Sequence, residues 1–109
     1  MGTIKELYDF VKKHGNDEVV TAEVMKEFLT KLKSVYEDFL QRKITDIEVS
    51  DATIYWCSTE EKFSDNLEKV EPRISGLNEA MDITHPDFSE DKKRKIISRM
   101  LGLVEELMS

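Results

Sequence analysis

Apolar residues recur at helical spacing through most of the chain. Between residues 21 and 43 they are separated by one, three or four positions, which is typical of a long amphipathic helix. The same spacing predicts a first helix over residues 3–14 and a last helix over 87–108. The apolar residues that define these three faces are Ile4, Leu7, Tyr8 and Val11; Val24, Met25, Phe28, Leu29, Leu32, Val35, Tyr36, Phe39 and Leu40; and Ile96, Ile97, Met100, Leu101, Leu103, Val104, Leu107 and Met108.

Capping residues and glycines refine these helices. Thr3 and Glu6 have the spacing of a capping box at the start of the first helix, and Gly15 predicts a left-handed residue at its end. Gly102 falls inside the last helix, where a glycine lowers helix propensity, so it predicts a close approach of a neighbouring helix. The last helix has three candidate capping residues, Thr84, Asp87 and Ser89.

The middle of the chain fits two alternatives. In one, Ser50 or Asp51 caps a helix over residues 51–71, whose inner face carries Trp56 and Phe63. In the other, residues 46–57 form a short hairpin. The helix is favoured, because a two-stranded hairpin without a third strand is marginally stable.

The predicted fold is therefore all-α, a single-domain bundle of four main helices over residues 1–109, with a short helix at 72–82 after Pro72. The minority alternative is an α+β fold with the hairpin at 46–57. A chain of 109 residues is long enough for one core but too short for two.

Charge is unevenly distributed along the chain, whose net charge is −7. Residues 44–91 contain three basic and thirteen acidic side chains, whereas residues 1–43 are balanced and residues 92–109 are basic. This asymmetry indicates a partner with a basic surface, because complementary charge accelerates encounter and selects partners.

The sequence lacks the residue spacings that are typical of catalytic and metal-binding sites. His14, His85 and Cys57 are far apart in sequence, unlike zinc ligands, which come in closely spaced pairs. Cys57 has acidic residues three and four positions later, which raise a thiol pKa rather than lower it. No glycine-rich phosphate loop is present. The sequence predicts no catalytic residue, no metal and no cofactor.

The candidate partner-binding residues surround the sequence ATIYWCSTEEKF at positions 52–63. Glu61, Asp65 and Glu68 are spaced to form one acidic stripe on a helix, and Glu60 adjoins it. Ile54 and Tyr55 lie off the main apolar face, so they are either core residues or an apolar contact beside the acids. The six candidates are Ile54, Tyr55, Glu60, Glu61, Asp65 and Glu68.

A basic patch at the start of the last helix offers an alternative function, weak nucleic-acid binding through Lys92, Lys93, Arg94, Lys95 and Arg99. No aromatic residue interleaves with this run to stack on bases. Pairing of these cations with the acidic region, within one molecule or across a homodimer, is a further interpretation.

The sequence thus predicts a non-enzymatic protein–protein interaction module, a small acidic regulator or inhibitor that docks through residues 44–91. The alternatives are nucleic-acid binding through residues 92–99 and a helical homodimeric assembly subunit. The chain has no apolar stretch typical of a signal peptide or a membrane span, and a single cysteine, which together favour a cytoplasmic protein without membrane contact.

Overall fold

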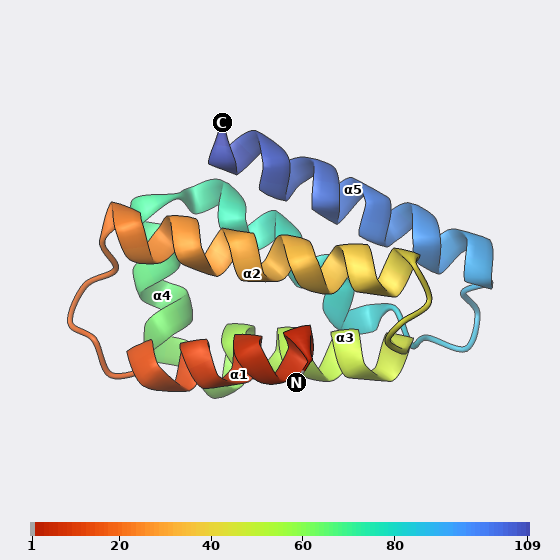
Figure 1. Ribbon diagram of the computed structural model, residues 1–109, viewed down its shortest axis with the longest axis horizontal. Coiled ribbons are helices and arrows are strands. Elements are labelled where there is room, and N and C mark those ends of the chain that lie inside the picture. The colour runs from red at the N-terminus through yellow and green to blue at the C-terminus, as the bar shows by residue number, and fades with distance from the viewer. Residues whose placement is uncertain (1) are drawn as a thin grey trace.

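Three helices frame the fold: α1 (Thr3–His14), α2 (Ala22–Leu40) and α5 (Glu90–Met108). In the computed structural model, which describes residues 2–109, α2 lies between α1 and α5 (Figure 1). The remaining elements, α3, η1, α4 and η2, pack behind this layer. The all-α prediction is confirmed, and residues 2–109 contain no strand.

The first helix has the predicted length, but both of its predicted end motifs are wrong. Gly2 is the capping residue, and the Thr3 hydroxyl donates instead to Asp38 on α2, 2.8 Å away. Gly15 has a right-handed conformation, with φ −59°. The Glu60 carboxylate lies against Gly15, so a Cβ at this position would require the end of that side chain to move.

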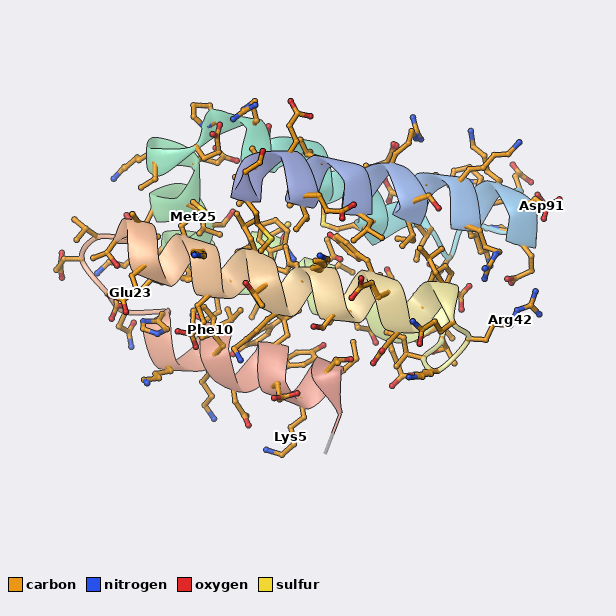
Figure 2. The ribbon with its side chains drawn as sticks, turned by 45° about the horizontal axis from the view of Figure 1, so that its top comes forward. Lys5, Phe10, Glu23, Met25, Arg42 and Asp91 are labelled. Atoms are coloured by element: carbon orange, nitrogen blue, oxygen red, sulfur yellow. The ribbon has the colours of Figure 1, made fainter. Side chains whose placement is uncertain are left out.

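The second helix ends three residues before its predicted boundary at residue 43. The Lys43 N–H donates to the carbonyl of Asp38 and the Arg42 N–H to that of Phe39, the two hydrogen bonds of a Schellman motif. This motif requires a left-handed residue after the cap, and Arg42 takes that position with φ 63°. Figure 2 shows the Arg42 side chain projecting beyond the end of α2.

The middle segment is helical, so the hairpin alternative for residues 46–57 is wrong. It comprises α3 (Asp46–Ile54), a π-helical turn η1 (Tyr55–Thr59) and α4 (Glu61–Val70). The helix starts five residues before its predicted boundary, because Thr45 and Glu48 form a capping box there. Its straight course ends at Glu60, whose ψ of 65° is not helical.

Aromatic side chains tie these elements together at the centre of the core. The Phe28 ring of α2 meets Trp56 of η1 and Phe63 of α4 edge to face, with ring centroids 5.1 and 5.3 Å apart. Phe10 packs against Phe28 from α1, and it lies between the two helices in Figure 2. All four rings are buried. Trp56 and Phe63 are therefore core residues, as the helical spacing predicted.

The chain returns through η2 (Pro72–Asp82), a run of 3₁₀ turns, to α5. Ser89 caps α5 by accepting a hydrogen bond from the Lys92 N–H, so one of the three candidate capping residues has this role. Gly102 is exposed and a Cβ there would meet no atom within 4 Å, which contradicts the predicted close helix approach. The apolar faces of α2 and α5 pack on each other and thereby close the core.

Candidate protein-binding surface

Exposed side chains follow the outer faces of α3 and α4, two helices that run in different directions and are separated by the π-helical turn η1 (Figure 1). These side chains recur at intervals of four and three residues, a spacing that keeps them on one side of α3 and, beyond the turn, on one side of α4. We call this set the outer stripe. It consists of Ile47, Asp51, Ile54, Ser58, Glu61, Asp65 and Glu68.

The inner face of the same segment explains why the outer stripe stays exposed. Val49, Trp56 and Leu67 are buried there and fix which side of the segment faces the core. Ser50 donates a hydrogen bond of 2.6 Å to the carbonyl of Met81, and Asn66 donates one of 3.0 Å to the carbonyl of Asp17. These hydrogen bonds join α3 to η2 and α4 to the loop after α1.

The carboxylates of the outer stripe are not neutralised by neighbouring cations. Among residues 2–109, no basic group lies within 4 Å of the carboxylate oxygens of Glu61, Asp65 or Glu68. Three other acids of the 44–91 region are paired: Asp46 with Lys93, Glu71 with Arg73 and Glu79 with Arg99. The outer face of α4 thus carries three of the carboxylates in this region that have no lysine or arginine within 4 Å among residues 2–109; the others are Glu48, Asp51, Glu60, Asp82, Asp87, Glu90 and Asp91.

Two of the six predicted contact residues, Tyr55 and Glu60, are half-buried by contacts within the fold. The half-buried Tyr55 ring packs on Tyr8 of α1, with centroids 4.8 Å apart, and its hydroxyl donates to Glu60 at 3.4 Å. Glu60 itself is half-buried over Gly15. Burial, followed by the charge of Glu60, raises the pKa of Tyr55. Ile54, by contrast, is 41% exposed.

Cys57, in the π-helical turn η1, contacts η2. Its thiol donates to the Asn78 side-chain oxygen at 2.9 Å. Burial, with a smaller contribution from Glu68, raises the pKa of Cys57 to about 12. The direction agrees with the sequence, but the main cause is burial rather than the adjacent acids. At neutral pH the sulfur is thus a protonated thiol rather than a nucleophilic thiolate.

Three of the five side chains in the basic patch at the start of α5 make intramolecular contacts. Lys93 pairs with Asp46 at 2.5 Å, Arg94 donates to the Leu40 carbonyl at 2.8 Å, and Arg99 contacts both carboxylate oxygens of Glu79, at 3.1 and 3.0 Å. Lys92 and Lys95 are exposed, and neither has an acidic oxygen within 4 Å in the described part of the chain.

The fold also brings together residues that are distant in sequence. Arg42 and Arg94 line one pocket of about 230 Å³, together with the acidic Asp46 and Glu90. Sequence reasoning did not connect Arg42 with the basic run, because 51 intervening residues separate them. The acids in this pocket offset the two arginines.

An apolar groove of about 260 Å³ lies where α2, α4 and α5 meet. Its apolar lining residues are Ala22, Met25, Leu29, Val70, Leu107 and Met108, and its charged ones are Lys26 and Glu71. The charges are of both signs, so they do not indicate which partner would fill it.

Within residues 2–109, no three histidine, cysteine or acidic side chains are placed to share a metal ion. In the same residues, no helix has both the length and the apolar composition that crossing a bilayer requires.

Sequence reasoning missed Ile47 and Asp51 of the outer stripe, because it began the third helix at residue 51. The signal was present as Thr45 and Glu48, the spacing of a capping box. A helix starting there places Ile47 seven residues before Ile54, on the same face.

Comparison of the chain with protein-family models, with curated proteins and with solved structures finds no match.

Proposed function

We propose that this protein is a non-enzymatic interaction module, an acidic regulator or inhibitor that docks on a basic surface of another protein. The observation that carries the proposal is the outer face of α4, where Glu61, Asp65 and Glu68 are exposed and lack a cation within 4 Å among residues 2–109. Uncompensated charge of one sign steers a complementary partner during diffusion and disfavours partners of the same sign.

The three α4 carboxylates differ from the ion-paired acids of the region and lie together on one helix. Asp46, Glu71 and Glu79 form ion pairs with cations of the same chain, so a partner would have to break those pairs. The α4 carboxylates have no such pair to break. Their interaction with a basic surface is screened by salt, because the Debye length is about 8 Å at physiological ionic strength.

The experiment is affinity capture from the lysate of the native host at low and high salt, with mass spectrometry of the eluted proteins. The test variant carries Glu61→Lys, Asp65→Lys and Glu68→Lys. It should lose the protein that the wild type retains at low salt, while its circular dichroism spectrum stays unchanged.

A matched control carries the same change of charge elsewhere, through Glu23→Lys, Glu27→Lys and Asp82→Lys. These residues are exposed and lie outside the outer stripe. The control should still capture the partner. If the α4 variant captures it as well as the control does, docking through α4 is refuted.

The alternative, nucleic-acid binding, draws on the exposed Lys92 and Lys95. Lys92→Gln with Lys95→Gln removes charge without disturbing the pairs of Lys93 and Arg99. If this function operates, the double variant binds nucleic acid more weakly and with a shallower dependence on salt. Unchanged binding would exclude it.

A further inference from the structure

A second hollow lies beside the apolar groove at α2, α4 and α5. It has a volume of about 120 Å³ and lies between α4 and the loop that follows α1. Val70 lines both hollows and therefore lies between them. Figure 1 shows the start of α2, α4 and the end of α5 in the same half of the molecule. We call the residues that line the two hollows the groove face; those of the second hollow are Glu18, Val19, Val20, Asn66, Lys69 and Val70.

The groove face brings together apolar side chains that are in contact with water. Val19 is 68% exposed and Val70 is 49% exposed, and both line the second hollow. Leu107 and Met108 of α5 are half-buried in the apolar groove, which Val70 also lines. Single exposed apolar residues are common on protein surfaces, whereas several of them around one hollowed surface are typical of a protein-binding site.

Both glutamates of the groove face are neutralised within the chain. Glu18 pairs with Lys62 at 3.2 Å, and Glu71 pairs with Arg73 at 2.9 Å. Among residues 2–109, the groove face therefore contains no carboxylate without a cation, although the chain has a net charge of −7. Two acidic molecules can thus meet on this face without bringing unpaired carboxylates together. On the outer face of α4 the same approach would be opposed by like charges.

The two lysines of the groove face are free to pair with a partner. Lys26 and Lys69 are exposed, and neither has a carboxylate oxygen within 4 Å in the described residues. A second copy of this chain is acidic overall, and its own groove face presents Glu18 and Glu71 beside apolar residues. Because a carboxylate accepts several hydrogen bonds, each glutamate can keep its own cation and also accept a lysine of the other copy.

The shape of the groove face also fits a second copy. In a contact with two-fold symmetry the same surface lies on both sides, so that surface must supply both a projecting residue and a hollow. Val70 is half-exposed and lies at the edge of the groove. Met25 and Met108 line the groove, and methionine side chains adapt to irregular gaps. Val70 of each copy can therefore enter the groove of the other.

We infer that the groove face binds a second copy of this chain in a two-fold symmetric contact around Val70. The apolar residues of the two groove faces cover one another, and Lys26 and Lys69 of each copy face the glutamates of the other. Glu61, Asp65 and Glu68 line neither hollow, so the dimer leaves their carboxylates free. The inference goes beyond the proposed function and does not depend on it.

The test is sedimentation equilibrium of the full chain at protein concentrations from about 5 to about 500 μM, a range that covers the Kd of small interfaces. The average mass of the wild type should rise with concentration from that of one chain toward that of two. A wild type that stays monomeric at the highest concentration overturns the inference, including the case in which the groove face binds a different protein.

The test variant is Val70→Glu, and the matched control is Ile47→Glu. Ile47 is 60% exposed on α3 and lines neither hollow, so both variants add one carboxylate at an exposed apolar position. Val70→Glu should raise the Kd of the dimer at least about tenfold, because it places a carboxylate against the apolar groove of the other copy. The control should stay within about twofold of the wild type. Equal weakening by both variants overturns the inference.

Two further measurements keep the test valid if Val70→Glu disturbs folding, which circular dichroism would reveal. Val19→Glu makes the same change in the loop after α1 and should also weaken the dimer. Dilution of ¹⁵N-labelled wild type should change the amide chemical shifts mainly around Val19, Lys69 and Val70. Changes that centre on Glu61 and Asp65 would place the contact on the outer face of α4 and overturn the inference.

Discussion

Arg42 provides a quantitative test of how the second helix ends. It occupies the left-handed position of the Schellman motif with φ 63°, a conformation in which the Cβ of an L-residue crowds the carbonyl that follows. The strain is about 1–2 kcal/mol for a residue other than glycine. Arg42→Gly removes it.

The gain is reduced by the larger freedom of glycine in the unfolded chain, which opposes folding by roughly 0.4–1 kcal/mol. The Arg42 side chain is exposed and donates no hydrogen bond within the described residues, so little else is lost. We expect Arg42→Gly to raise the free energy of unfolding by about 0.5–1 kcal/mol. That gain corresponds to a Tm increase of roughly 2–8 °C for a domain of this size.

Urea unfolding followed by far-ultraviolet circular dichroism measures this difference, provided that the slope m is unchanged. Arg42→Ala is the matched control, because it removes the same charge but retains the Cβ and should therefore leave stability near that of the wild type. If Arg42→Gly is no more stable than Arg42→Ala, Arg42 does not hold the left-handed conformation and the described end of α2 is wrong.

Two further predictions follow from the pKa shifts. Since burial raises the pKa of Cys57 to about 12, iodoacetamide should alkylate it on the order of 100-fold more slowly in buffer at pH 8 than in urea, and equal rates would contradict its buried environment. The hydrogen bond from Lys93 lowers the pKa of Asp46. The pair therefore stabilises the fold at pH values above the ordinary pKa of a carboxyl group, and this stabilisation is lost as the pH falls through the lowered pKa. Asp46→Asn should therefore be less stable than the wild type at pH 7, by a margin that shrinks below about pH 4 in urea titrations; a margin that stays constant to pH 3 would refute the pairing.

The long helices could be predicted from the sequence because their apolar spacing is regular over several turns. In α1, α2 and α5 the inner face is fixed by repeated apolar residues, and the structure places those helices within a few residues of their predicted bounds. Their end motifs were less predictable. The Glu60 carboxylate, 45 residues later in the chain, lies against Gly15, and no local pattern reports such a contact.

The middle segment was harder because its apolar residues face two ways. Ile47 and Ile54 point outward while Val49 and Ala52 are buried, so spacing alone gave no single inner face for residues 46–54. The π-helical turn then changes the register. Thr59 and Val70, which a straight helix places inside with Trp56, are exposed.

The candidate surface was predicted in part. The sequence located the exposed acids Glu61, Asp65 and Glu68 through their spacing. It could not show that Tyr55 packs on Tyr8 of α1 or that Glu60 lies against Gly15 at the end of that helix. Both contacts join distant parts of the chain. The intramolecular partners of Lys93 and Arg99 were likewise set by the tertiary fold.

The central claim is that the outer face of α4 is the surface that contacts the partner. Its most direct test is ¹⁵N–¹H chemical-shift mapping of the labelled protein, titrated with the partner that the capture experiment identifies. We expect the largest shift changes, and loss of signal, at the exposed positions of α4, around Glu61, Asp65 and Glu68. Changes centred instead on Lys92 and Lys95, or on the groove around Met25 and Met108, would contradict the claim.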